Sequence, residues 1–143
     1  MLAAPVVLTL GFLESAGLAM SIWWAWVAMD VSGEVRGGTA YAWSGAMLFP
    51  AAQPMQPVNL SAARGVSFRV RGAGSFQVAL FTQRGGRVPA VLRIESTDAW
   101  TTHVLAWSDF GDHDGADVQG IAIMAGPEAG AFDFRLDDVQ LTR

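Results

Sequence analysis

The stretch from Val66 to Gln83 constrains the fold of this chain more than any other part of the sequence. It reads VSFRVRGAGSFQVALFTQ, and apolar residues take every second position on both sides of a glycine-rich centre, residues 72–74. Such alternation is typical of strands that bury one face, and a glycine turn between two alternating runs predicts a β-hairpin. The other face, which meets either solvent or a polar ligand, carries Arg69, Arg71, Gln77, Phe81 and Gln83.

Composition favours a single all-β domain. The 143 residues suffice for one sizeable core, and 52% hydrophobic residues with 16 glycines indicate tight turns around a large apolar interior. The chain has no cysteine, which excludes disulfides and thiolate metal sites. Its nine basic residues are all arginines, scattered singly in a chain of net charge −4, so we expect no nucleic-acid partner.

Residues 1–29 form an apolar segment whose only charge is Glu14 and which holds several tryptophans. A run of this length can span a bilayer, and tryptophans collect at membrane interfaces. However, no Lys or Arg precedes the run and glycines interrupt it, which argues against a signal peptide or an anchor. We expect this segment to be helical or disordered, with membrane contact less favoured. A truncated or misread start is a further alternative.

The remainder, residues 30–143, consists of short apolar runs separated by glycines and prolines. This spacing predicts seven or eight strands and a β-sandwich of two antiparallel sheets. A break of phase at Asp137 and Asp138 predicts a β-bulge. The residues expected on the inner surfaces are Phe68, Val70, Phe76, Val78, Leu80, Ile121, Ile123, Phe132 and Phe134.

Catalytic machinery is sparse. His103 and His113 are the only histidines, and no G-x-S-x-G elbow accompanies them to form a catalytic triad. We expect His103 to lie on the polar face of a strand and the protein not to be an enzyme. The carboxylates between Asp109 and Asp117 suit either a solvated turn, which we favour, or a calcium ion.

A resemblance covers most of the chain, from Val31 to Leu141. Three segments occur in the same order as in the complex I intermediate-associated protein 30 family, and the bacterial members are the most similar. They read SGAMLFPAAQPMQPVNLSAARGVSFRVRGAGSFQVALFTQRGGRVP, AWTTHVLAWSDFG and GADVQGIAIMAGPEAGAFDFRLDDVQL. The resemblance implies a galactose-binding-like jelly roll similar to several carbohydrate-binding modules. The family's aspartate-bearing opening strand and glycine-rich "D..mGG.S" element have no counterpart before Val31.

The same resemblance implies a role in binding. The family's namesake assists the assembly of mitochondrial respiratory complex I, and bacterial members often act as accessory modules. We therefore expect a non-catalytic binding or assembly module that acts through protein contacts or as an accessory domain. We expect it in the bacterial cytoplasm rather than secreted or membrane-anchored. The alternative is a carbohydrate-binding module, and a small hydrolase is less favoured.

The candidate ligand-binding residues combine planar rings with hydrogen-bonding side chains, as sugars require. They are Tyr41, Trp43, Arg69, Arg71, Phe81 and Gln83. Trp43 is alternatively a core residue, and the two arginines alternatively pair with Asp133 or Glu95 across strands. By the family resemblance, Asp137 and Asp138 are candidates for a structural calcium ion, the only cofactor considered. Capping of the bulge amides is the simpler role for these carboxylates.

Overall fold

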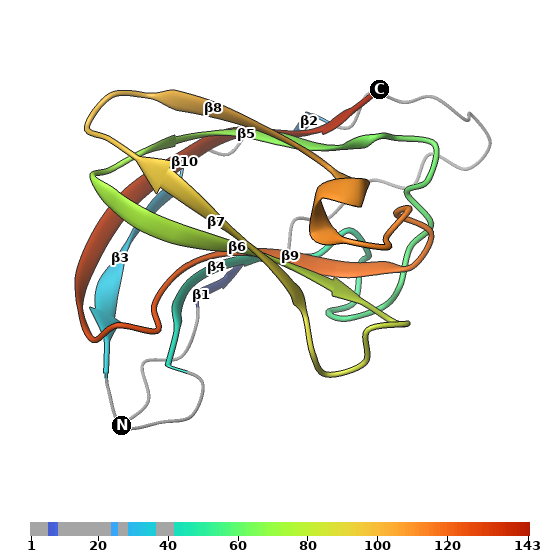
Figure 1. Cartoon of the computed structure of the whole chain (residues 1–143), viewed down its shortest axis with the longest axis horizontal. Helices are drawn as coiled ribbons and strands as arrows, with labels where there is room; N and C mark the ends of the chain where they lie inside the picture. Colours follow the sequence, from blue (N-terminus) through green and yellow to red (C-terminus); the bar gives the residue numbers. More distant parts are fainter. Residues whose placement is uncertain (1–5, 9–23, 26–28, 37–41) are drawn as a thin grey trace.

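The computed structural model of the chain describes residues 6–8, 24–25, 29–36 and 42–143. They form two β-sheets that stack face to face as the layers of a sandwich (Figure 1). Sheet A has five strands in the order β1-β4-β9-β6-β7. These strands are β1 (Val6–Leu8), β4 (Ser44–Leu48), β9 (Val118–Ala125), β6 (Gly74–Thr82) and β7 (Ala90–Ser96).

Sheet B, also of five strands, has the order β2-β10-β5-β8, with β3 as a further partner of β10. Its strands are β2 (Trp24–Ala25), β3 (Met29–Val35), β5 (Gly65–Arg71), β8 (Thr101–Ala106) and β10 (Gly130–Thr142). Apart from the parallel pair β1 and β4, the described strand pairs are antiparallel. The predicted all-β sandwich is confirmed.

The hairpin prediction for residues 66–83 is wrong. β5 belongs to sheet B, where it pairs with β10 and β8, whereas β6 belongs to sheet A, where it pairs with β7 and β9. The glycines between them carry the chain from one sheet to the other, with Gly72 at φ 143° and Gly74 at φ 145°. Both runs still turn their apolar side chains toward one interior. Alternation therefore identified the buried face but not the pairing partner.

The predicted inner surfaces are confirmed. All nine residues named from the alternation belong to the core between the sheets, with Phe132 partly buried and the others buried. Phe134 contacts Phe76 across the interior, with ring centroids 4.9 Å apart. The short 3-10 helix η1 (Trp107–Phe110) adds Trp107 and Phe110 to this core, and the Trp107 indole N–H donates to the Ala63 carbonyl at 2.9 Å.

Parts of the apolar N-terminal segment belong to the sheets. β1 pairs in parallel with β4, and β2 pairs with β10 at Val139 and Gln140. The rest of residues 1–28, and with it the expectation of a helical or disordered segment, lies outside the described residues. In the described part of the chain, no helix is long and apolar enough to cross a membrane. The division at residues 29 and 30 stays a prediction.

Candidate ligand-binding faces of the two sheets

The candidate ligand-binding residues do not form one cluster. Trp43 and Phe81 lie on the outer face of sheet A, while Arg69 and Arg71 lie on the outer face of sheet B. The separation follows from the crossover between β5 and β6, because residues assigned to one hairpin belong to opposite layers. Tyr41 lies outside the described residues.

Gln83 stands apart from both faces. It is exposed in the turn after β6, and its backbone N–H donates to the Asp117 carbonyl at 3.1 Å. The ladder between β6 and β9 shifts register between Phe81 and Thr82, so the alternation that linked Gln83 to Phe81 in the sequence does not continue past the strand. Gln83 therefore lies next to sheet A, just beyond the end of β6, and is not part of the row of outward side chains on that strand.

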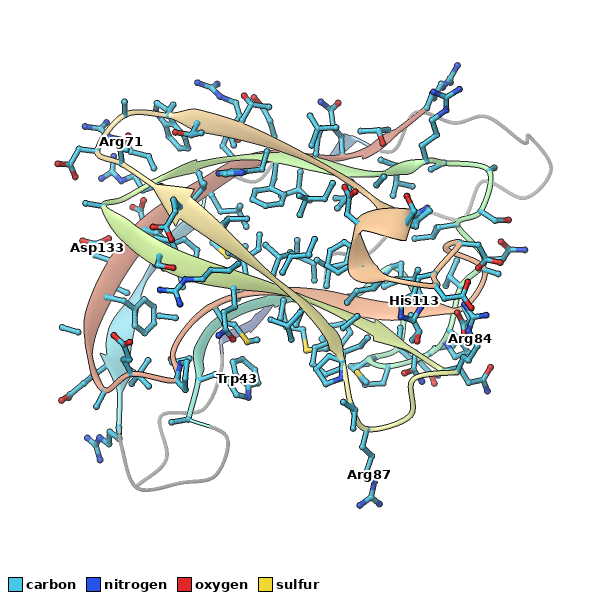
Figure 2. All side chains as sticks on the ribbon, viewed as in Figure 1. Trp43, Arg71, Arg84, Arg87, His113 and Asp133 are labelled. Atoms are coloured by element: carbon cyan, nitrogen blue, oxygen red, sulfur yellow. The ribbon has the colours of Figure 1, made fainter. Side chains whose placement is uncertain are left out.

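The outer face of sheet A carries a second apolar cluster, which we call the platform: Met47, Phe49, Ala79, Ala122 and Met124. These residues are buried although they lie on the side of the sheet away from the core, and Trp43 and Phe81 pack against them while remaining partly exposed. Figure 2 shows Trp43 on the side of sheet A that faces away from sheet B. Two rings from different parts of the chain thus rest on a packed base.

A missing side chain gives the platform its shape. A Cβ at Gly120, which pairs with Phe81, would lie 2.8 Å from the Met47 methyl and 3.4 Å from Phe49 Cδ1. Met47 and Phe49 therefore fill the space above Gly120. This surface was not predicted from the sequence. The available signal was the uninterrupted apolar character of residues 46–49 and 121–125, which is typical of strands covered on both faces.

Polar groups lie beside the platform on the same face. Gln77 pairs with Arg93 of β7, and both point outward because Phe76 and Val78 point to the core. Arg93 Nε donates to Ser75 Oγ at 2.5 Å and lies 3.5 Å from a carboxylate oxygen of Glu95. The Arg93 and Glu95 side chains are mostly exposed, so their remaining donors and acceptors can meet a ligand.

On sheet B the candidate arginines are engaged within the protein. Arg69 Nη1 lies 3.4 Å from Asp138 Oδ2, and its guanidinium carbon lies 5.1 Å from the centre of the Trp100 ring. Arg71 Nε donates to the Asp98 carbonyl at 2.6 Å. Arg69 thus pairs with a carboxylate on a neighbouring strand, but with Asp138 rather than with the predicted Asp133 or Glu95, which pairs with Arg93 instead. Since Arg69 and Asp138 are each about half-exposed, water weakens this pair.

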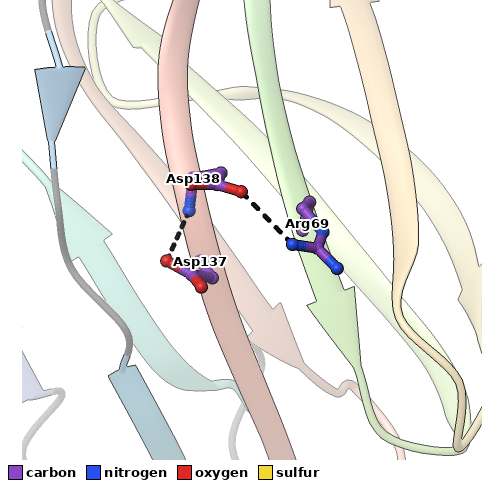
Figure 3. A network of polar contacts seen from close by, with 3 residues as sticks. All are labelled: Arg69, Asp137 and Asp138. Carbon is purple, nitrogen blue, oxygen red and sulfur yellow. Dashed lines mark hydrogen bonds and ion pairs between the residues drawn. The ribbon is translucent and has the colours of Figure 1, made fainter.

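The predicted β-bulge is confirmed at Asp137 and Asp138. The register between β10 and β5 shifts there, and Asp138 has a φ of 50°. Figure 3 shows the Asp137 carboxylate accepting the Asp138 backbone N–H at 2.8 Å, while the Asp138 carboxylate meets Arg69. Both candidate calcium ligands therefore have partners of their own. Within the described ranges, no three His, Asp or Glu residues are grouped closely enough to hold a metal ion.

The prediction that His103 lies on the polar face is wrong, because its side chain points into the sandwich beside Phe68. Its ring stacks on Phe68 with centroids 5.6 Å apart, and its Nε2 is buried without a hydrogen-bond partner in the described structure. Burial lowers the pKa of His103 below 6.5, because the charged ring loses water there. The outward positions of β8 belong instead to Thr102 and Val104, both exposed.

The acidic loop is held by its own carboxylates. Asp109, Asp114 and Asp117 each accept a backbone N–H, from Ala106, Ala116 and Arg84 respectively, at 2.7–3.0 Å. Arg84 also donates through Nη2 to the Asp112 carbonyl, and Figure 2 shows Arg84 and His113 at the same end of the molecule. These bonds make the loop a hydrogen-bonded turn in which Asp109, Asp112 and Asp114 remain exposed.

Comparisons with known proteins identify the fold. No family model and no curated protein matches the chain. Among solved structures, it is similar to a family 30 carbohydrate-binding module of a cellulosomal cellulase from Clostridium thermocellum. The TM-score is 0.59 at 14% identity, over 79% of this chain and 73% of the other. A family 11 module from the same organism matches with a TM-score of 0.50 at 17% identity, over 90% and 91% of the two chains.

Two further solved structures are similar to the chain. A family 29 carbohydrate-binding module gives a TM-score of 0.52 at 12% identity, over 85% of this chain and 76% of that one. An exo-beta-agarase matches with a TM-score of 0.51 at 12% identity over 93% of this chain, but only over 25% of the enzyme. The fold is therefore a galactose-binding-like jelly roll, as the family resemblance implied. No comparison supports the complex I intermediate-associated protein 30 family itself.

Proposed function

We propose that the protein is a carbohydrate-binding module and that the platform of sheet A, with Trp43 and Phe81, receives the sugar. The supporting observation is the gathering of two partly exposed rings on a buried apolar base, beside the polar groups of Gln77, Arg93 and Glu95. The jelly-roll fold is shared with modules named for carbohydrate binding. A binding role through protein contacts rests on the family resemblance alone.

The chemistry of the face suits a neutral oligosaccharide. Pyranose rings present flat C–H surfaces that stack on aromatic side chains, and their hydroxyls need both donors and acceptors. Arg93 supplies donors, Glu95 supplies acceptors, and Gln77 supplies both. Because the base holds Trp43 and Phe81 by packing, little side-chain freedom is left to lose on binding, which favours affinity.

Titration calorimetry against neutral cello-, mixed-linkage gluco- and agaro-oligosaccharides tests the proposal. We expect saturable binding to at least one of them, and a loss of about tenfold or more in Trp43→Ala, as is typical of an aromatic anchor. Trp100→Ala is the matched control, because Trp100 is an exposed tryptophan on the opposite sheet. Melting temperatures of both variants separate lost binding from lost folding.

Two results would count against the glycan proposal. One is the absence of binding to every oligosaccharide of the panel, which would favour a protein partner. The other is an equal loss of affinity in Trp43→Ala and Trp100→Ala, which would move the site away from the platform.

A further inference from the structure

Strand β8 is an edge strand without the usual protection. In the described structure, β3, β7 and β8 each pair with a strand on one side only. Edge strands commonly carry charges that discourage pairing with another chain. β3 carries Asp30 and Glu34, and β7 carries Arg93 and Glu95, whereas the sequence of β8, TTHVLA, has no Asp, Glu, Lys or Arg and no proline.

The hydrogen bonds around β8 show which backbone groups point outward. Trp107 N–H, directly after the strand, donates to the Arg64 carbonyl on the β5 side at 2.9 Å. The backbone N–H and C=O groups of successive residues in a strand point to opposite sides. Those of residues 102, 104 and 106 therefore point away from β5. Ala106 agrees with this alternation, because its N–H donates to Asp109 Oδ2 at 2.8 Å. Asp109 thus caps the backbone at the Ala106 end of the edge. The outward backbone N–H and C=O groups of Thr102 and Val104 face the open side.

These groups are self-complementary. A two-fold axis beside His103 would place Thr102 opposite Val104 of a second copy, and Val104 opposite its Thr102. Each such antiparallel pair exchanges two backbone hydrogen bonds, so the axis supplies about four. Val104, 64% exposed, would then pack beside a β-branched threonine.

The flanking side chains match in size in the same register. Trp100, 37% exposed, would face Ala106 of the second copy, which is next to Gly65 in the ladder. A large ring thus meets two small residues. No like charges are brought together along the strand, because β8 has none of the charged residues that its counterparts β3 and β7 carry.

We propose that β8 pairs antiparallel with β8 of a second copy of this chain to form a two-fold dimer. A two-fold contact uses the β8 edge of both copies, so the assembly closes at two. The contact is small and consists mainly of backbone bonds, so the dimer is weak and depends on protein concentration. It joins the two copies of sheet B into one sheet and leaves both platforms of sheet A accessible, so this proposal does not depend on the glycan proposal.

Sedimentation velocity over a concentration series tests the dimer. The wild-type protein is expected to shift from monomer to dimer as concentration rises, and Val104→Lys is expected to remain monomeric because it places a charge at the centre of the contact. Val91→Lys is the matched control, since Val91 is an exposed valine on the edge strand β7. A wild-type monomer at every concentration would overturn the proposal, as would equal dimerisation of Val104→Lys and the wild type.

A cysteine experiment tests the register, because the chain has no cysteine of its own. Thr102→Cys and Val104→Cys are prepared separately and then mixed under oxidising conditions. Positions 102 and 104 face each other across the axis, so the mixture is expected to form a disulfide-linked heterodimer far faster than either variant alone forms a homodimer. Equal rates in all three samples, or no cross-linking in the mixture, would exclude this register.

Discussion

At the scale of single residues, the environment of a side chain was decided by residues far away in sequence. His103 lies in an alternating strand that has Thr and Val on one side and Thr and Leu on the other, so alternation alone did not say which set is buried. Phe68 decides it, because its ring lies in the core and offers a stacking surface to the imidazole. The buried Nε2 makes protonation of His103 unfavourable in the folded protein.

A pH dependence of stability follows from His103. Its folded-state pKa lies below the unfolded value of 6.5, so the unfolded chain binds the proton more readily. Stability is therefore greatest above pH 6.5 and falls as the pH drops from 6.5 toward the folded-state pKa. Melting temperatures measured between about pH 5 and pH 8 should show this slope, and His103→Phe should flatten it while preserving the stacked ring. An unchanged slope in His103→Phe would contradict the assignment.

Two glycines of sheet A should respond differently to an added methyl group. At Gly120 a Cβ meets the flexible end of Met47, so Gly120→Ala is expected to cost about 1 kcal/mol. At Gly45 a Cβ would lie 2.6 Å from Met124 Cα, where the β9 backbone itself must move, so Gly45→Ala is expected to cost about 3 kcal/mol or more. Urea unfolding of both variants measures the difference. An equal cost would show that Met47 is as rigid as the backbone.

At the scale of elements, local patterns predicted strands and failed on their pairing. The bulge in β10 could be predicted because a slip of one residue exchanges the buried and exposed positions, which is visible as a break of phase at Asp137. The strands that pair with β5 could not be predicted, because a glycine-rich link is compatible with a hairpin and with a crossover between sheets. The platform was missed for a related reason: Met47 and Met124 belong to apolar runs that fit either one buried face or two.

The bulge depends on a carboxylate cap. Asp137→Ala removes the acceptor of the Asp138 N–H, and the loss should lower the free energy of unfolding by about 1 kcal/mol. Asp133→Ala, at an exposed position on the same strand, should change it by less than about 0.5 kcal/mol. Urea unfolding of the two variants measures these changes. An unchanged free energy of unfolding in Asp137→Ala would show that water caps the amide equally well.

At the scale of the whole molecule, the sequence by itself determined the all-β class, the inward residues such as Phe68 and Ile123, and the bulge at Asp137. Each depends on the alternation of side chains along one strand, which is a local property. The tertiary structure alone decided that β5 and β6 lie in opposite sheets and hence that Trp43 is separated from Arg69. It also decided that β8 is an edge. Strand pairing joins segments distant in the chain, and its energy comes from contacts that no single segment contains.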